Sequence, residues 1–400
     1  MSFVTWKIEV SPYNGSTWSS ATQVTSFYGP DVQVSTGDSR DMFSFKMNNF
    51  ANSRLLTAGV NDKVTIYRAV NTSTITSDHI IMVGTVSNIS PEEDDRKDLI
   101  RVEGYNYTDT IMSAIGFADA TNLTIPNAIS SLLSSVSLYA SQFGVTWNSS
   151  NPSTRVDGTA FPVVGEKYFN RPLRQIIEKL STKEVTGDSV VYYWYVNKDN
   201  ELIWRPATLT ASYTFNASTD DYKAAKPGKD VSEVKNYVII KGGVDPNGVV
   251  IQTKYYDSAS VVKNRPKYLI ITDETKFALN LHKADCDKAG VRTMKDYTFG
   301  TFVPTWTSTS YSSFNTYVDA FRTYVKAYLS SKGRQAVETT LKGRLMLTVE
   351  FAPGKGWPLG ALIAVTHPFF GSTVKQLRVT DIHYTTERDI FTLKEDIGSL

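Results

Sequence analysis

The chain has 400 residues, more than one hydrophobic core usually organises, so we expect two or three domains. Hydrophobic residues make up 41% and charged residues 20%, which excludes a disordered chain. The 42 basic and 40 acidic side chains give a net charge of +2, which excludes the strong overall positive charge typical of nucleic-acid-binding proteins. The single cysteine, Cys286, excludes an internal disulfide and a cysteine-cluster metal site.

The first ten residues alternate like a β-strand. They lack the basic segment and apolar core of a signal peptide, so we expect none. No window approaches the roughly 18 apolar residues that span a bilayer. We therefore expect a soluble protein that is made in the cytoplasm and does not bind a membrane.

The first hundred residues predict a succession of short β-strands. The candidate strands are residues 4–10, 31–35, 42–47, 63–68, 80–86 and 99–104. Short, closely spaced strands favour a small barrel or a sandwich. The acidic run 92–95 lacks the ligand spacing and glycine of a calcium loop, and we interpret it as a solvated hairpin tip.

The pattern changes at about residue 106. Two helices are predicted after Pro126 and Pro172, because Ile and Leu recur at helical spacing behind each proline. The aromatic run 190–196 and the segment 201–206 predict a hairpin. We interpret residues 106–230 as a smaller α+β insertion.

The polar run 223–230 is predicted to be a connector, and a new strand begins at 234–243. Further strands are predicted at 249–256 and 267–272. An amphipathic helix with an aromatic stripe is predicted from residue 314. The stripe residues proposed for a subunit interface are Phe314, Tyr317, Phe321, Tyr324 and Tyr328. Tyr and Phe are enriched at protein interfaces, which favours an interface between subunits. The alternative is that the stripe packs against the neighbouring sheet.

The C-terminal segment repeats the pattern of the N-terminal one. Segments 42–47, 60–67, 84–89 and 98–104 are matched, in order, by 344–350, 353–365, 377–382 and 389–395. The repeat predicts two similar small β-barrels in one chain. The expected domains are a first barrel at 1–105, completed by strands near 190–230, an α+β insertion at 106–230, and a second barrel at 231–400 with a helical insertion at about 273–335.

Five sets of segments recur in a characteristic order along the chain: Val234–Gly243, Leu359–Val365, Leu377–Ile382, Phe43–Met47 with Gly84–Gly104, and Tyr192–Trp204. Together these motifs resemble those of the baseplate hub or tail-tip hub proteins of tailed phages, whose fold is also used at the base of type VI secretion spikes. The resemblance implies a mainly β chain with two barrels per subunit and three subunits per ring. Residues 273–312 depart from the family pattern.

The resemblance further implies a structural protein of the virion, assembled in the host cytoplasm, that joins the tail tube to the spike or fibre and lines the DNA channel. The implied partners are two further copies of the chain, the tail tube protein, a distal tail or baseplate protein, a spike or fibre protein and the tape measure protein. Phage DNA would pass without specific binding, which the near-neutral charge suits, because phosphate contacts would slow it. No catalytic residue, metal or cofactor is implied.

Enzyme chemistry has little support in the sequence. The four histidines, at positions 79, 282, 367 and 383, do not have zinc-motif spacing. Asp381 and His383 share a face of a predicted strand, but no Gly-X-Ser-X-Gly elbow supplies a nucleophile. The alternative function is a monomeric carbohydrate- or cell-surface-binding β-protein, or a cell-wall-degrading enzyme. Its sugar platforms would be Trp18, Trp147 or Trp306.

Overall fold

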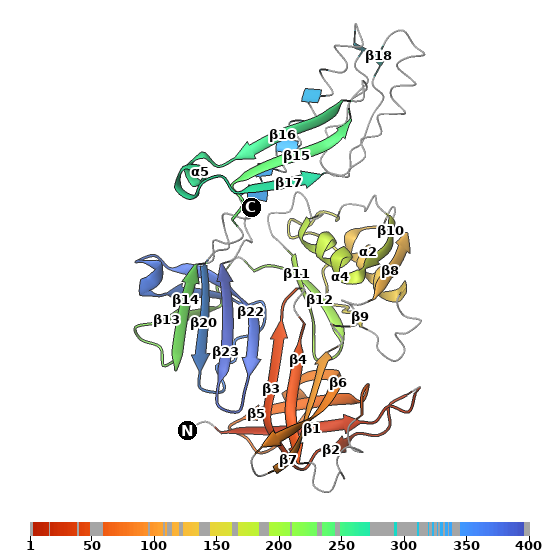
Figure 1. Cartoon of the computed structure of the whole chain (residues 1–400), viewed down its shortest axis with the longest axis vertical. Helices are drawn as coiled ribbons and strands as arrows, with labels where there is room; N and C mark the ends of the chain where they lie inside the picture. Colours follow the sequence, from red (N-terminus) through yellow and green to blue (C-terminus); the bar gives the residue numbers. More distant parts are fainter. Residues whose placement is uncertain are drawn as a thin grey trace. The chain divides into compact units, whose positions relative to one another are not determined.

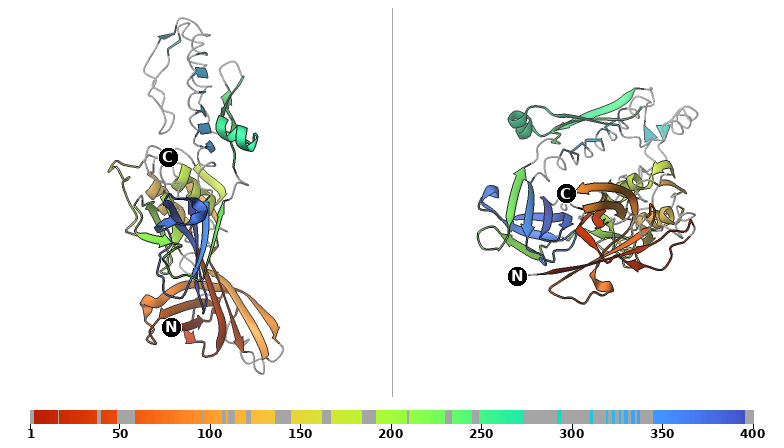
Figure 2. Two further views of the ribbon diagram at one scale, coloured as in Figure 1. Left: turned by 90° about the vertical axis from the view of Figure 1, so that its left-hand side faces the viewer. Right: turned by 60° about the horizontal axis from the view of Figure 1, so that its bottom comes forward.

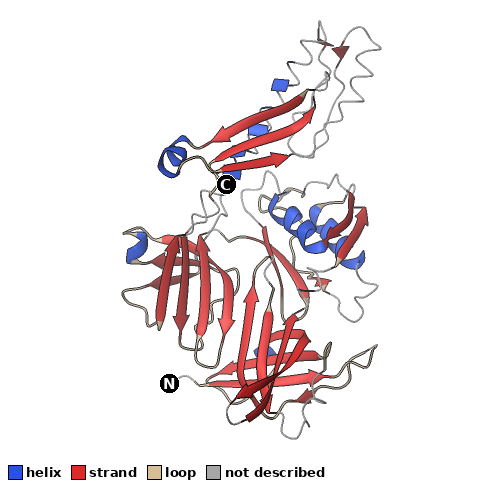
Figure 3. Ribbon diagram, in the orientation of Figure 1, coloured by secondary structure: helices blue, strands red, loops and turns tan. Residues whose placement is uncertain are grey.

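This computed structural model describes most of residues 3–272 and 345–395, and scattered residues between 292 and 337. The longest gaps within the first range are 49–58, 136–144 and 184–191. The chain divides into two compact units, Met1–Gly228 with Leu345–Ser399, and Lys229–Arg344. Strands predominate over helices in the described part of the chain (Figure 3).

The N-terminal strands curl into the first barrel (Figure 1, red to orange; Figure 2). Its elements are β1 (Val4–Ser11), β2 (Thr22–Gln23), β3 (Phe27–Ser35), β4 (Met42–Asn48), β5 (Lys63–Val70), the 3-10 helix η2 (Ser77–His79), β6 (Ile80–Asp94) and β7 (Lys97–Asn106). The strand order is β3-β4-β7-β6-β5-β1-β2, with every neighbouring pair antiparallel. Alternate side chains such as Phe43, Phe45 and Met47 are buried in its core, as the period of two predicts.

The second barrel combines two strands from before residue 230 with four from the C-terminal segment. Its elements are β13 (Tyr213–Asn216), β14 (Ala224–Lys229), β20 (Leu345–Phe351), β21 (Leu362–Thr366), the 3-10 helix η5 (Pro368–Phe370), β22 (Lys375–Tyr384) and β23 (Asp389–Glu395). The order is β14-β20-β23-β22-β21-β13, in which β13 runs parallel to β21. Phe215, Phe351, Trp357 and Phe391 pack in its core at ring-centroid distances of 5.1–6.4 Å.

The two barrels have the same strand order. The path β3-β4-β7-β6-β5-β1 in the first barrel matches β14-β20-β23-β22-β21-β13 in the second. The long strand of each barrel also changes register at the same place: β6 between Val86 and Asn88, and β22 between Val379 and Asp381. The internal repeat predicted from the sequence is therefore confirmed, and a shared β-bulge marks it.

The equivalence extends to single hydrogen bonds. The Val86 N–H donates to the Asp62 carbonyl at 2.9 Å, and the Val379 N–H donates to the Ala361 carbonyl at the same distance. The residue before each acceptor, Asn61 or Gly360, has a positive φ, 73° and 78° respectively. The loop before β5 and the loop before β21 therefore reach the bulge through the same left-handed turn.

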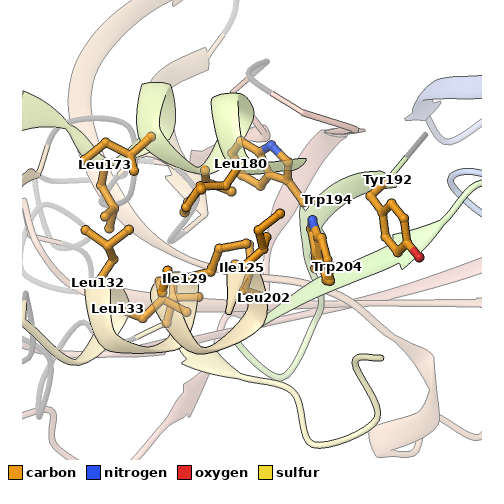
Figure 4. Packing of buried hydrophobic residues seen from close by; sticks show 14 of the residues in the cluster. Ile125, Ile129, Leu132, Leu133, Leu173, Leu180, Tyr192, Trp194, Leu202 and Trp204 are labelled. Atoms are coloured by element: carbon orange, nitrogen blue, oxygen red, sulfur yellow. The ribbon is translucent and has the colours of Figure 1, made fainter. Parts of the chain in front are cut away.

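The α+β insertion contains two small sheets and the main helices. Its elements are β8 (Ile115–Asp119), α2 (Ile125–Ser135), β9 (Thr146–Trp147), β10 (Lys167–Pro172), α4 (Leu173–Glu178), the π-helix η3 (Lys179–Lys183), β11 (Tyr192–Val196) and β12 (Glu201–Pro206). The hairpin predicted near 190–206 is formed by β11 and β12, which pair antiparallel. Apolar side chains of α2 and α4 pack against the hairpin's Tyr192, Trp194 and Trp204 (Figure 4).

The structure differs from the expectation that strands near 190–230 complete the first barrel. β11 and β12 pair with β9, and their aromatic side chains are buried against the helices of the insertion. β13 pairs with β21, and β14 pairs with β20. Residues 223–230, predicted to be a connector, therefore contain an edge strand of the second barrel. Pro227 and Gly228 are typical of loops, but an edge strand tolerates both, so the prediction of a connector was wrong.

The second unit contains a separate three-stranded sheet. Its elements are β15 (Tyr237–Val244), β16 (Val250–Tyr256), α5 (Ser258–Asn264), β17 (Tyr268–Thr272), β18 (Arg292–Thr293) and β19 (Ser310–Tyr311). The sheet order is β16-β15-β17, with β15 and β17 parallel. The strand predicted at 234–243 thus begins a sheet of its own, whereas the sequence placed it in the second barrel. Val238 and Ile240 are fully buried on one face of this sheet.

Candidate functional site

The two barrels are joined edge to edge by β3 and β22. These strands pair antiparallel from Asp381 opposite Ser35 to Tyr384 opposite Val32. The Thr36 N–H extends the ladder by donating to the Thr380 carbonyl at 2.8 Å. The junction makes the two barrels one continuous hydrogen-bonded sheet (Figure 1).

A buried ion pair crosses the junction. The Arg68 guanidinium, from β5, donates to Asp389 Oδ1, from the start of β23, and the two side chains are 5% and 2% exposed. The second carboxylate oxygen of Asp389 accepts the Gly354 N–H at 2.8 Å. The guanidinium also lies over the rings of Trp6 and Tyr384, at 5.5 Å and 4.8 Å from the centroids. Because both charges are desolvated, each depends on the other to remain inside the protein.

Tyr384 is shared by the two barrels. Its ring packs against the cores of both, and so does the side chain of Val34. Burial, with a smaller contribution from the nearby Asp389 carboxylate, raises the pKa of Tyr384 to about 12, and Arg68 opposes the shift. The phenol therefore stays neutral in the folded protein well above its usual range.

A second polar contact lies at the more exposed side of the junction. His383 Nε2 is 2.7 Å from Asp31 Oδ1, and the side chains are 33% and 45% exposed. Deeper in, the buried Asp41 carboxylate accepts the Ser35 N–H at 2.7 Å and a hydrogen bond from the Asn106 amide. These bonds hold the end of β3, which is the strand that reaches the second barrel.

The five residues predicted for a subunit interface lie outside the described residues. They are Phe314, Tyr317, Phe321, Tyr324 and Tyr328. Their role stays a prediction. The sequence did not predict the pair of Arg68 and Asp389, because no local pattern links two residues that are 321 positions apart.

The histidines of the described chain take part in structural contacts. His383 pairs with Asp31, whereas Asp381 Oδ2 accepts a hydrogen bond from the Thr380 hydroxyl at 2.7 Å. His367 Nδ1 accepts the Phe369 N–H at 3.1 Å. Among the described residues, no group of three His, Cys, Asp or Glu side chains is placed to hold a metal ion.

The tryptophans considered as sugar platforms pack locally. Trp18 and Trp147 are both partly buried against the core of the insertion. The Trp18 indole N–H donates to the Asn61 carbonyl at 3.1 Å, and the Trp147 ring lies 6.1 Å from that of Trp204. Trp306 lies outside the described residues. This packing leaves Trp18 and Trp147 poorly placed to stack on a sugar.

Within the described part of the chain, no helix has the length and apolar character required to cross a membrane.

No protein-family model and no curated protein matches the sequence. Solved structures do match along nearly the whole chain. The 43 kDa tail protein of prophage MuSo2 from Shewanella oneidensis is 13% identical, with a TM-score of 0.58, and the match covers 97% of this chain and 96% of that one. The tail protein from Neisseria meningitidis MC58 is 10% identical, with a TM-score of 0.57 and coverage of 98% and 97%.

A third match is the prophage tail protein gp18 from Listeria monocytogenes EGD-e. It is 13% identical, with a TM-score of 0.52, and the match covers 98% of this chain and 94% of that one. At sequence identities of 10–13%, the similarity to these three structures shows the fold alone. The chain therefore has the fold of phage tail proteins, mainly β with two small barrels and an α+β insertion, as the resemblance to hub proteins led us to expect.

Proposed function

We propose that this chain is a structural subunit of a phage tail, the baseplate or tail-tip hub that joins the tail tube to the spike or fibre and surrounds the DNA channel. The observation that carries the proposal is the edge-to-edge junction of two barrels with the same strand order in one chain. The likeness to prophage tail proteins over almost the full chain supports the same role.

Paired barrels suit a change of symmetry. Three copies of a two-barrel chain present six similar surfaces to a six-fold tube above, while the ring remains three-fold for a spike or fibre below. The proposed partners are the tail tube protein, a distal tail or baseplate protein, the spike or fibre protein and the tape measure protein. The same role would make the chain a component of the virion, assembled in the host cytoplasm.

The buried contacts between the barrels fit a mechanical role. A ring that carries load needs its two barrels held in one fixed orientation, and the strand pair β3–β22 with the Arg68–Asp389 ion pair supplies such a connection. The net charge of +2 fits a channel that DNA crosses without specific binding, because few phosphate contacts would form. We propose no catalytic activity and no cofactor.

Antibody labelling of phage particles tests this function. Particles produced by cells that carry the gene would be labelled with antibody against the purified chain and viewed by electron microscopy. We expect label at the end of the tail tube that lies away from the head. Label along the tail, on the head, or only on free protein would contradict the proposal.

A further inference from the structure

The first barrel has an open strand edge where the second barrel has a partner. After the bulge at Val379, β22 pairs with β23 on one side and with β3 on the other. After the equivalent bulge at Val86, β6 pairs with β7 on one side. No described strand pairs with the other side of β6 from Ser87 to Glu92.

The second barrel has the matching open strand. β14 occupies the position that β3 has in the first barrel, next to β20 as β3 is next to β4. β3 uses its other edge to reach β22, whereas β14 pairs only with β20 among the described strands and ends the sheet. Among its described strands, each chain therefore has one unused edge of the β6 kind and one of the β14 kind.

We propose that β14 of one copy docks along the Ser87–Glu92 edge of β6 in a second copy, in the antiparallel sense in which β3 docks on β22. The inference rests on the proposed function, because it supplies the contact between copies that a ring requires. The contact is heterologous, so each copy offers both edges and a closed ring leaves neither free. The internal pairing of β3 with β22 shows how β14 of a second copy would pair with β6.

Charge complementarity supports a second copy as the occupant. In the antiparallel sense, the first residues of β14 lie alongside the last residues of β6, which brings Lys226 close to Glu92. Lys226 is exposed, and its ammonium lies 3.8 Å from the Glu350 carboxylate of the same chain. Glu92 is part-buried and contacts Lys46 at 2.5 Å. An ion pair at such a position mainly sets register and partner choice.

Prolines on both edges limit the pairing to a short segment. Pro91 lies on the β6 edge and Pro227 lies on β14. Proline has no N–H, so Pro91 and Pro227 donate no hydrogen bond to a facing strand, and the ladder between copies would rest on the residues beside them. Prolines on open edges are a common protection against aggregation, which fits edges that are exposed in the free subunit and covered in the ring.

The contact between copies lacks the buried ion pair of the internal junction. By the register of the two repeats, the positions equivalent to Arg68 and Asp389 are His367 and Ile100. Ile100 carries no charge and is buried. The contact between copies would therefore form without the buried charges that lie beside the internal junction.

Charge reversal at this contact tests the inference. Lys226→Glu and Glu92→Lys should each weaken ring formation by about tenfold or more, because each places like charges together. The double variant should restore ring formation. Lys254→Glu, on exposed β16, is the matched control and should assemble normally. Melting temperatures of the variants would show whether each subunit is still folded.

Cross-linking between copies separates this inference from the proposed function. A mixture of isotope-labelled and unlabelled full chains would be treated with a carbodiimide, which joins amines to carboxylates directly. We expect mixed-isotope peptides that join the Lys226 region of β14 to the Glu92 region of β6. Rings without these peptides, or with unchanged assembly of both single variants, would overturn the inference while the proposed function survives. A chain that forms no ring at any concentration, alone or with the tube protein, would overturn both.

Discussion

Arg68 in β5 and Asp389 in β23 form a buried ion pair between the two barrels, although 321 positions separate them in the sequence. The pair lies beside the β3–β22 junction, with Tyr384 packed against the guanidinium. It is the polar centre of the connection that makes two similar barrels a single body.

Loss of one member of this pair should be costly. Arg68→Met would leave the Asp389 carboxylate buried without its partner, and the free energy of unfolding should fall by about 3–5 kcal/mol. Arg68→Met combined with Asp389→Asn should recover part of that loss, because no unpaired charge remains. Urea unfolding of the three proteins measures both effects.

A surface pair supplies the control. Arg388 contacts Glu350 at 2.7 Å but is 44% exposed, so Arg388→Met should change the free energy of unfolding by less than about 1 kcal/mol. Equal losses for Arg68→Met and Arg388→Met would show that the buried pair has no special part in the junction.

Tyr384 should make the protein sensitive to alkali. Its pKa is raised to about 12 by burial, whereas a tyrosine in an unfolded chain titrates at about 10. The neutral phenol therefore stabilises the fold fully below about pH 10, and this stabilisation is lost as the pH rises towards about 12. Urea midpoints of the wild type and of Tyr384→Phe should show a steeper decline for the wild type over this range. Identical slopes would contradict the assignment.

Gly104 should not tolerate a side chain. A Cβ there would lie 2.1 Å from the Thr85 carbonyl oxygen and 2.4 Å from the Phe43 ring, so Gly104→Ala must displace the backbone or the core. We expect a loss of at least about 2 kcal/mol. Gly228→Ala, whose Cβ would meet only the Met346 methyl at 3.6 Å, is the matched control. Thermal melting that does not distinguish the two variants would be contrary to expectation.

The sheet of the second unit should depend on its buried face. Val238→Asp places a carboxylate where the side chain is fully buried, and the unit should unfold because the charge has no partner. Ile270→Asp, at a position 61% exposed on β17, should leave the unit folded. Limited proteolysis within residues 229–344 compares the two. A protease-resistant Val238→Asp unit would refute the assignment of β15 as the core strand.

The sequence predicted the repeat because local patterns carry it. The shared bulge falls in segments 86–89 and 379–382, which both begin with valine and end with isoleucine. The turn before each bulge partner requires a positive φ, and Asn61 and Gly360 occupy these positions. Apolar spacing behind Pro126 and Pro172 likewise located α2 and α4.

The junction was not predictable in the same way. β3 and β22 meet across nearly the whole chain, and the period of a strand does not specify which distant strand it pairs with. The strand β14 was predicted to be a connector because Pro227 and Gly228 are common in turns. Whether a strand tolerates them depends on its place at a sheet edge, which is a property of the tertiary structure. The sequence therefore predicted barrels but assigned strands 213–229 to the wrong one.

The mass of the purified chain in solution, with class averages of the same sample, tests the central claim most directly. Native mass spectrometry should give three copies, and electron microscopy should show a ring with a central hole and six similar lobes, one for each barrel. A particle that remains a monomer at every concentration and in the presence of the tube protein, or a ring whose lobes do not number six, would contradict the account.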